Sequence, residues 1–191
     1  MIRTGIALAA LAALATASAA SGQDEAIRLT IQAPSVVARG APIPLRVAVA
    51  ADPGAMNGAT GPLRLRVRLA PECASTFAAT SGPVAIDRRL PAPGAASAPY
   101  TANVRGSGRV AALGAYSVCA FVEEEGDDRL FAADSGTQLE ATQACTTATR
   151  KVTRATAALR RARRAHLTGR VRTLRRRLGT AAAARRRACG A

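Results

Sequence analysis

The middle of the chain alternates apolar and polar residues over short stretches that glycine and proline interrupt. In segment 63–69, for example, Leu63, Leu65 and Val67 alternate with arginines. A period of two places the apolar side chains on one face, as in a half-buried strand of an antiparallel sheet. The glycine- and proline-rich segments 51–61 and 91–99 mark loops between strands. We predict strands at 27–31, 45–49, 63–69, 84–86, 100–104, 116–122 and 130–133.

The C-terminal segment 145–189 follows a helical pattern. It contains no proline, and Val152, Leu159 and His166 recur every seven residues. This spacing predicts an amphipathic helix. Its seam also contains Ala155 and Ala162.

A second run of apolar residues steps by three and four after residue 166 and predicts a second helix. The run consists of Leu167, Val171, Leu174, Leu178 and Ala181. Between the helices, Gly169 is the expected turn former and Thr168 the expected cap of the second helix.

The first 20 residues have the layout of a secretory signal peptide. Arg3 precedes an apolar stretch at 5–15, and Ala-Ser-Ala at 17–19 offers a cleavage motif. An uncleaved anchor is the alternative, but an alanine-rich segment this short is weakly hydrophobic for spanning a bilayer. We expect signal cleavage and a soluble mature protein, secreted or held at the cell surface outside the cytoplasm.

The four cysteines fit an oxidising destination. Cys73, Cys119, Cys145 and Cys189 permit three pairings. We favour Cys73–Cys119 and Cys145–Cys189, because each bond then closes one structural unit through a loop of about 45 residues, worth roughly 4 kcal/mol. There is no Cys-x-x-Cys spacing and only one histidine, so we expect no metal site and no cofactor.

The segment GAYSVCAF at 114–121 carries a resemblance to a known architecture. It resembles strand F of the immunoglobulin-like and fibronectin-III-like modules of exported bacterial proteins, in which a tyrosine shortly precedes a cysteine. Tyr116 lies three residues before Cys119, whereas the antibody pattern has two. The resemblance implies an antiparallel Ig-like β-sandwich at 24–142, in which a Cys73–Cys119 bond would join strand F to strand C. It implies nothing specific about function.

The cysteine positions also bear on the arrangement of the helices. Residue 167 is the midpoint between Cys145 and Cys189, so two antiparallel helices of about 20 residues would bring both cysteines together. The alternative is one continuous helix of about 66 Å that forms a dimeric coiled coil. Gly169 and Gly179 would each cost that helix about 1 kcal/mol, which favours a helical hairpin at 145–189.

The distribution of charge along the 191-residue chain also changes at about residue 145. The net charge is +15, and fifteen of the 27 basic residues lie in 146–191, which contains no acidic residue. A neutral domain with a cationic appendage indicates contact with a polyanion, and guanidinium groups suit phosphate and carboxylate. A solvated helical face on an arginine-rich spacer is the alternative. The candidate polyanion-binding residues are Arg160, Arg161, Arg163, Arg164, Arg170, Arg172, Arg175, Arg176, Arg177, Arg185, Arg186 and Arg187.

The acidic segment EEEGDD at 123–128 follows a predicted strand. We predict an exposed hairpin tip between two strands. A calcium site, which here lacks EF-hand spacing, and a contact with the cationic tail are the alternatives.

These observations favour an exported, non-catalytic binding protein. The chain has no Gly-x-Ser-x-Gly elbow and no phosphate-binding glycine loop, so we expect no catalytic residues. Its hairpin would contact a polyanionic surface: envelope phosphate, acidic polysaccharide, anionic lipid or nucleic acid. One alternative is an assembly module that oligomerises through its tail helices. Another is a secreted cationic effector that perturbs anionic membranes.

Overall fold

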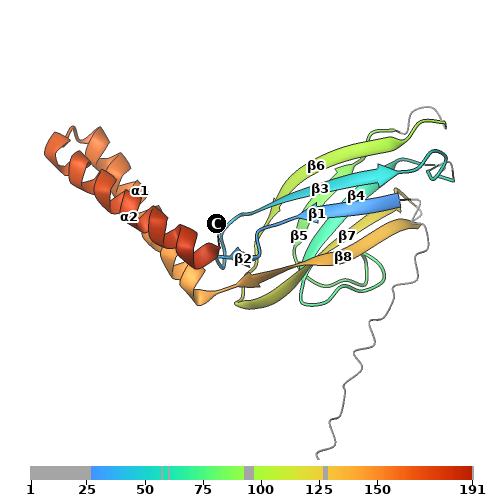
Figure 1. The fold of residues 1–191 in the computed structure, drawn as a ribbon, viewed down its shortest axis with the longest axis horizontal. Coiled ribbons are helices and arrows are strands. Elements are labelled where there is room, and N and C mark those ends of the chain that lie inside the picture. The colour runs from blue at the N-terminus through green and yellow to red at the C-terminus, as the bar shows by residue number, and fades with distance from the viewer. Residues whose placement is uncertain (1–26, 57, 60, 93–96, 127–128, 191) are drawn as a thin grey trace, which may run out of the picture.

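A β-rich body is followed by two antiparallel helices that project from one of its ends (Figure 1). This computed structural model describes residues 27–56, 58–59, 61–92, 97–126 and 129–190, so the predicted signal peptide lies outside the described residues. The elements are β1 (Ile27–Gln32), β2 (Val36–Val37), β3 (Ile43–Ala51), β4 (Leu63–Ala70), β5 (Val84–Arg89), β6 (Tyr100–Gly108), β7 (Gly114–Glu124), β8 (Leu130–Ala141), α1 (Gln143–Arg164) and α2 (Thr168–Cys189).

Two sheets share one hydrophobic core. One has the order β1-β3-β6, and the other has the order β2-β8-β7-β4-β5. The alternation seen in the sequence explains the core, because the apolar residues of each strand face inward. Leu45 of β3, Leu65 of β4 and Val118 of β7 are all buried in the same cluster. Each buried leucine or valine stabilises the fold by about 1.5–3 kcal/mol.

All seven predicted strands form, but the prediction of purely antiparallel sheets is wrong. An eighth strand, β2, pairs in parallel with the end of β8. The Glu140 N–H donates to the Ser35 carbonyl oxygen at 2.7 Å, and the Thr142 N–H donates to that of Val37 at 3.2 Å. Two residues are too few to show an alternating pattern, so only the pairing with β8 reveals this strand.

The strand β7 is buried on both faces. Its inward residues join the main core, while Cys119 and Phe121 pack on the other face with Ala70 and Phe77. The Cys73–Cys119 disulfide, with 5.5 Å between the Cα atoms, fixes the segment 71–83 over this outer face. Phe77 meets Phe121 edge to face, with ring centroids 6.1 Å apart. The predicted disulfide therefore forms, and it secures a second, smaller core.

The first two glutamates of the segment 123–128 are buried instead of lying in an exposed tip. Glu123 and Glu124 end β7 and are each 3% exposed, so the prediction of an exposed acidic tip is wrong for both. The Glu123 carboxylate accepts hydrogen bonds from Arg66 Nη1 at 3.0 Å and from the Phe77 N–H at 3.3 Å. Such charge-assisted bonds compensate the cost of burying the carboxylate.

The neighbouring Glu125 binds arginines of the same sheet. It forms ion pairs with Arg64 of β4 and Arg89 of β5. This end of β7 is the end of the sheet remote from α1 and α2 (Figure 1). Glu123 and Glu125 therefore do not contact the cationic helices. Residues 127 and 128 lie outside the described residues.

The helix α1 starts immediately after β8 and is tied to the body by its first turn. Thr142 is the N-cap, and its Oγ1 accepts a hydrogen bond from the Cys145 N–H at 3.1 Å. The buried Thr146 hydroxyl accepts a hydrogen bond from the Arg39 N–H at 2.9 Å and donates one to the Thr142 carbonyl oxygen. These bonds set the direction in which α1 leaves the sheets.

The helix α2 returns along α1, and the Cys145–Cys189 disulfide joins the two helices at the body end, with 4.9 Å between the Cα atoms. This confirms the helical hairpin and the predicted pairing. The single continuous helix of the alternative does not form, because the chain reverses between residues 164 and 168.

The reversal lies beside the predicted midpoint at residue 167, but its left-handed residue is His166 and not the predicted turn former Gly169. His166 has φ +53°, its N–H donates to the Arg163 carbonyl oxygen, and the Leu167 N–H donates to that of Ala162. These two bonds make a Schellman motif, which ends a helix with one left-handed residue. Gly169 lies inside α2, and Leu167, not Thr168, is the N-cap of α2. Hydrogen bonding to the last turn of α1 decides the position of the turn, not glycine content.

We expect His166→Gly to stabilise the protein by about 1 kcal/mol, because a non-glycine residue in the left-handed region is strained by roughly that amount. Urea unfolding followed by circular dichroism measures the change. The matched control is Ala165→Gly, one residue earlier at φ −88°, which should destabilise the hairpin. A loss of stability in both variants would contradict the assignment of strain to His166.

Candidate functional site

The helical hairpin (α1 and α2) has a thin apolar seam. Leu159 and Ala162 of α1 are buried as predicted, but His166 is exposed and does not belong to the seam. No residue of α2 is fully buried, and Leu174 and Leu178 are half-buried. Few methylene groups therefore hold α2 against α1, and the disulfide makes a large contribution to their association.

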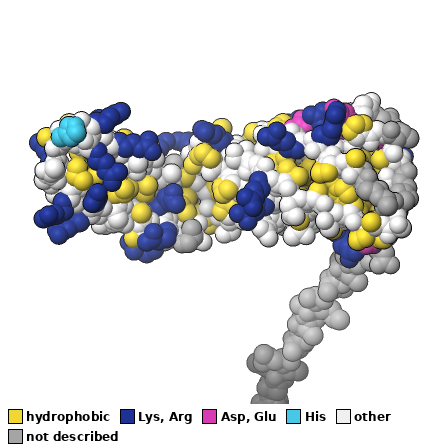
Figure 2. Space-filling model, turned by 90° about the horizontal axis from the view of Figure 1, so that it is seen from above, with side chains coloured by type: hydrophobic (Ala, Val, Ile, Leu, Met, Phe, Trp, Pro, Cys, Tyr) yellow, Lys and Arg dark blue, Asp and Glu magenta, His cyan; other side chains and the backbone are white. Residues whose placement is uncertain are grey.

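The basic side chains of the helical hairpin all lie exposed. This holds for the twelve candidate arginines and for Arg150, Lys151 and Arg154. On the face seen in Figure 2, basic side chains cover the helical end, while acidic side chains lie over the body. Within the described part of the chain, no salt bridge joins a basic residue of α1 or α2 to a carboxylate. These cations repel one another within a Debye length of about 10 Å.

The structure does not gather the twelve arginines into one site. Consecutive helical residues point about 100° apart, so runs such as 175–177 spread around α2. Arg160, Arg161 and Arg164 do converge on a shallow hollow of about 520 Å³ along α1. The helical hairpin is thus a rod that is cationic along its length, with separate hollows.

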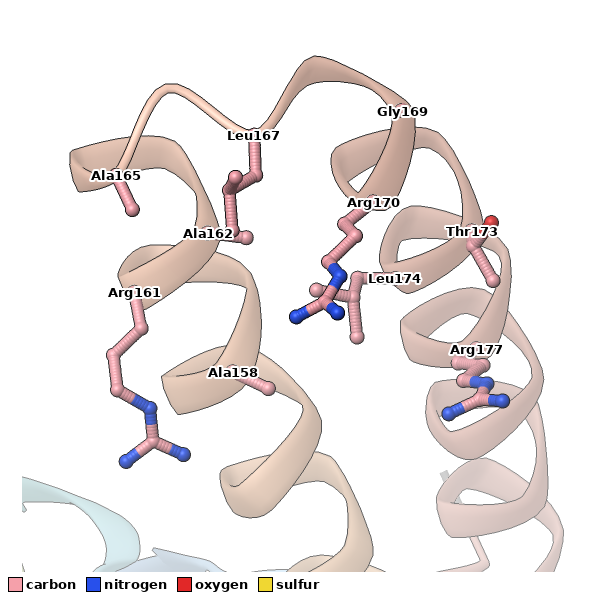
Figure 3. A pocket seen from close by; sticks show the side chains of 10 residues that line it. All are labelled: Ala158, Arg161, Ala162, Ala165, Leu167, Gly169, Arg170, Thr173, Leu174 and Arg177. Carbon is pink, nitrogen blue, oxygen red and sulfur yellow. The ribbon is translucent and has the colours of Figure 1, made fainter.

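One hollow lies at the far end, between the two helices, and we call it the tip groove (Figure 3). It measures about 580 Å³ and takes basic residues from both helices: Arg161 from α1, and Arg170 and Arg177 from α2. Its floor is apolar and is formed by Ala158, Ala162, Ala165, Leu167 and Leu174. The spacing of the leucines predicts a seam and does not reveal this groove, because the groove exists only where the two helices meet.

A second hollow, about 390 Å³, lies where the helical hairpin joins the body. Arg39 of the β2–β3 loop meets Arg150 and Arg154 of α1 there, together with the hydroxyl residues Thr149 and Thr153. These arginines are not among the candidates predicted from the sequence. Arg150 and Arg154 belong to the same acid-free segment and were therefore detectable, whereas Arg39 lies more than a hundred residues earlier and was not.

Three further properties of the described residues concern metal binding, membrane crossing and titration. Within them, no group of three or more histidine, cysteine, aspartate or glutamate residues is placed to hold a metal ion. Nor does any described helix have the length and hydrophobicity needed to cross a membrane. In the body, burial raises the pKa of the Tyr100 hydroxyl, which donates a hydrogen bond to the Pro91 carbonyl oxygen at 3.1 Å.

Comparison with known proteins adds no family to this description. No protein-family model matches the chain, and no curated protein matches it significantly. The fold and the distribution of charge are therefore the basis for a functional proposal.

We expect the double substitution Cys145→Ser and Cys189→Ser to free α2 from α1. A loop of this length contributes roughly 4 kcal/mol through its disulfide, and α2 has no buried residue to replace that contribution. Trypsin should then cleave within 168–189 at least tenfold faster. Cys73→Ser with Cys119→Ser is the control, because it opens the second core instead. Unchanged cleavage of α2 in the first variant would show that the seam alone holds the helix.

Proposed function

We propose that this protein is an exported, non-catalytic binding protein whose helical hairpin attaches it to a polyanionic surface. The observation that carries the proposal is the set of fifteen exposed basic side chains on one disulfide-closed projection without carboxylates. Anions from outside the chain are the available partners for these cations, and arginine forks suit phosphate and carboxylate oxygens. The two disulfides are typical of an oxidising compartment, which supports export through residues 1–20.

The body is proposed to be a variant of the Ig-like sandwich that presents loops or a sheet edge to a second partner. Tyr116 supports this interpretation, because its hydroxyl donates to the Ala112 carbonyl oxygen at 3.3 Å, as in the tyrosine corner of such domains. The disulfide departs from the antibody pattern. Cys119 faces away from the main core, so its bond to Cys73 secures an outer loop instead of crossing between the sheets.

Polyanion binding predicts a steep dependence of affinity on salt. With a 20-base-pair DNA duplex as a model polyanion, the logarithm of the association constant should fall linearly with the logarithm of salt concentration. The variant Arg175→Gln, Arg176→Gln and Arg177→Gln should flatten the slope by about 0.9 for each phosphate that the variant no longer neutralises. Fluorescence anisotropy at four salt concentrations measures both slopes.

The matched control removes the same charge from the body. Arg46, Arg88 and Arg105 are exposed on the sheets, and replacing all three by glutamine also lowers the net charge by three. That variant should keep the wild-type slope, because the removed charges lie outside the helical hairpin. An equal change in both variants would indicate a response to net charge alone and would contradict a binding role for the helical hairpin.

A further inference from the structure

The tip groove differs from the rest of the cationic rod because it combines charge with exposed apolar surface. Figure 3 shows Leu167 descending from the turn toward Ala162, while Arg170 and Leu174 point from α2 toward α1. Leu167, a large apolar residue at the turn between the helices, is 43% exposed. A nucleic acid or a polysaccharide would engage the arginines and leave this apolar floor in water.

The electrostatics of the tip favour a negatively charged group. The helix α2 begins here without a side-chain cap, so the positive end of its dipole faces the tip. Arg161, Arg170 and Arg177 add three full charges around the floor. The volume of about 580 Å³ is within the usual range for small-molecule sites, about 300–1,000 Å³. A ligand that uses every part of the groove has an anionic head and an apolar body.

We propose that the tip groove binds an anionic phospholipid of a bilayer, with the phosphate at the arginines and the first acyl methylenes on the apolar floor. This inference rests on the proposed function and names the partner of one part of the helical hairpin. The groove lies at the turn end of the helical hairpin. This end projects away from the body (Figure 1), so a bilayer surface can reach it without contacting the body. The protein then stands tip first on the membrane surface and does not span it.

The test compares the full chain on three probes: vesicles with 30% phosphatidylglycerol, neutral phosphatidylcholine vesicles and the 20-base-pair DNA duplex. Leu167→Gln should weaken binding to the anionic vesicles about fivefold, because part of a leucine side chain no longer leaves water. Its affinity for DNA should stay within twofold of wild type. Leu113→Gln is the matched control, since Leu113 is also 43% exposed but lies on the body, and it should change neither affinity.

A second pair of variants locates the charge requirement. Replacing Arg161, Arg170 and Arg177 by glutamine should weaken binding to the anionic vesicles about a hundredfold, at roughly fivefold for each arginine near an anionic surface. Replacing Arg185, Arg186 and Arg187 removes equal charge at the other end of α2, about 12–26 Å along the helix axis from Arg177 and Arg170 and beyond the Debye length of about 10 Å. That variant should lose less than threefold. Circular dichroism confirms that each variant keeps its helices.

Each contrary result has a distinct meaning. Salt-sensitive DNA binding without a preference for anionic over neutral vesicles would overturn the lipid site and leave the proposed function intact. Binding to neither DNA nor anionic vesicles would contradict both the lipid site and the proposed function. Equal effects of Leu167→Gln and Leu113→Gln, or of the two arginine triplets, would also overturn the lipid site. A second copy of the chain is the other occupant that the tip groove could accept, and light scattering measures the mass in solution. A wild-type dimer that Leu167→Gln dissociates would assign the groove to this second copy and overturn the lipid site.

Discussion

The Cys145–Cys189 disulfide holds together two helices whose charges drive them apart. Fifteen cations and no anion occupy this part of the chain, and α2 buries no residue completely. Hydrophobic contact is therefore small where electrostatic repulsion is large. The covalent bond at the base and the Schellman motif at the tip close the hairpin at both ends. The cationic surface is thus displayed in a fixed shape, on a rod whose direction is set by the bonds between α1 and the body.

Arginine has opposite roles in the two parts of the molecule. In the body, Arg64, Arg66 and Arg89 bind Glu123 and Glu125, so charges of both signs compensate one another within the sheet. Arg66 and Arg68 also lie over the ring of Phe77, at 3.7 and 4.2 Å from its centroid. In the helical hairpin no carboxylate is available, and the same side chain remains exposed. Arginines beside acidic residues therefore stabilise the fold, whereas the arginines of the helical hairpin, which have no acidic neighbour in sequence, are available to bind a partner.

The predictions that fail have a common physical origin. The acidic segment 123–128 has the composition of an exposed turn, yet Glu123 is buried because β4 places Arg66 beside it. Glycine favours turns, yet Gly169 lies inside α2. The chain reverses at His166, where two hydrogen bonds close the last turn of α1. In both cases a partner distant in sequence or a backbone hydrogen bond outweighs local propensity, and composition records neither.

The sequence by itself determined the seven longer strands, the two helices, both disulfide pairings and the segregation of charge. These features follow from periodicity, from cysteine spacing and from counting residues, all of which are local or arithmetic. Only the tertiary structure decided the parallel pairing of β2, the second core under the segment 71–83 and the tip groove. The first two depend on segments far apart along the chain, and the tip groove depends on how two consecutive helices pack against each other. Whether an apolar side chain such as Leu167 fills a seam or stays exposed beside arginines is decided by the geometry of the helix pair, which no single helix encodes.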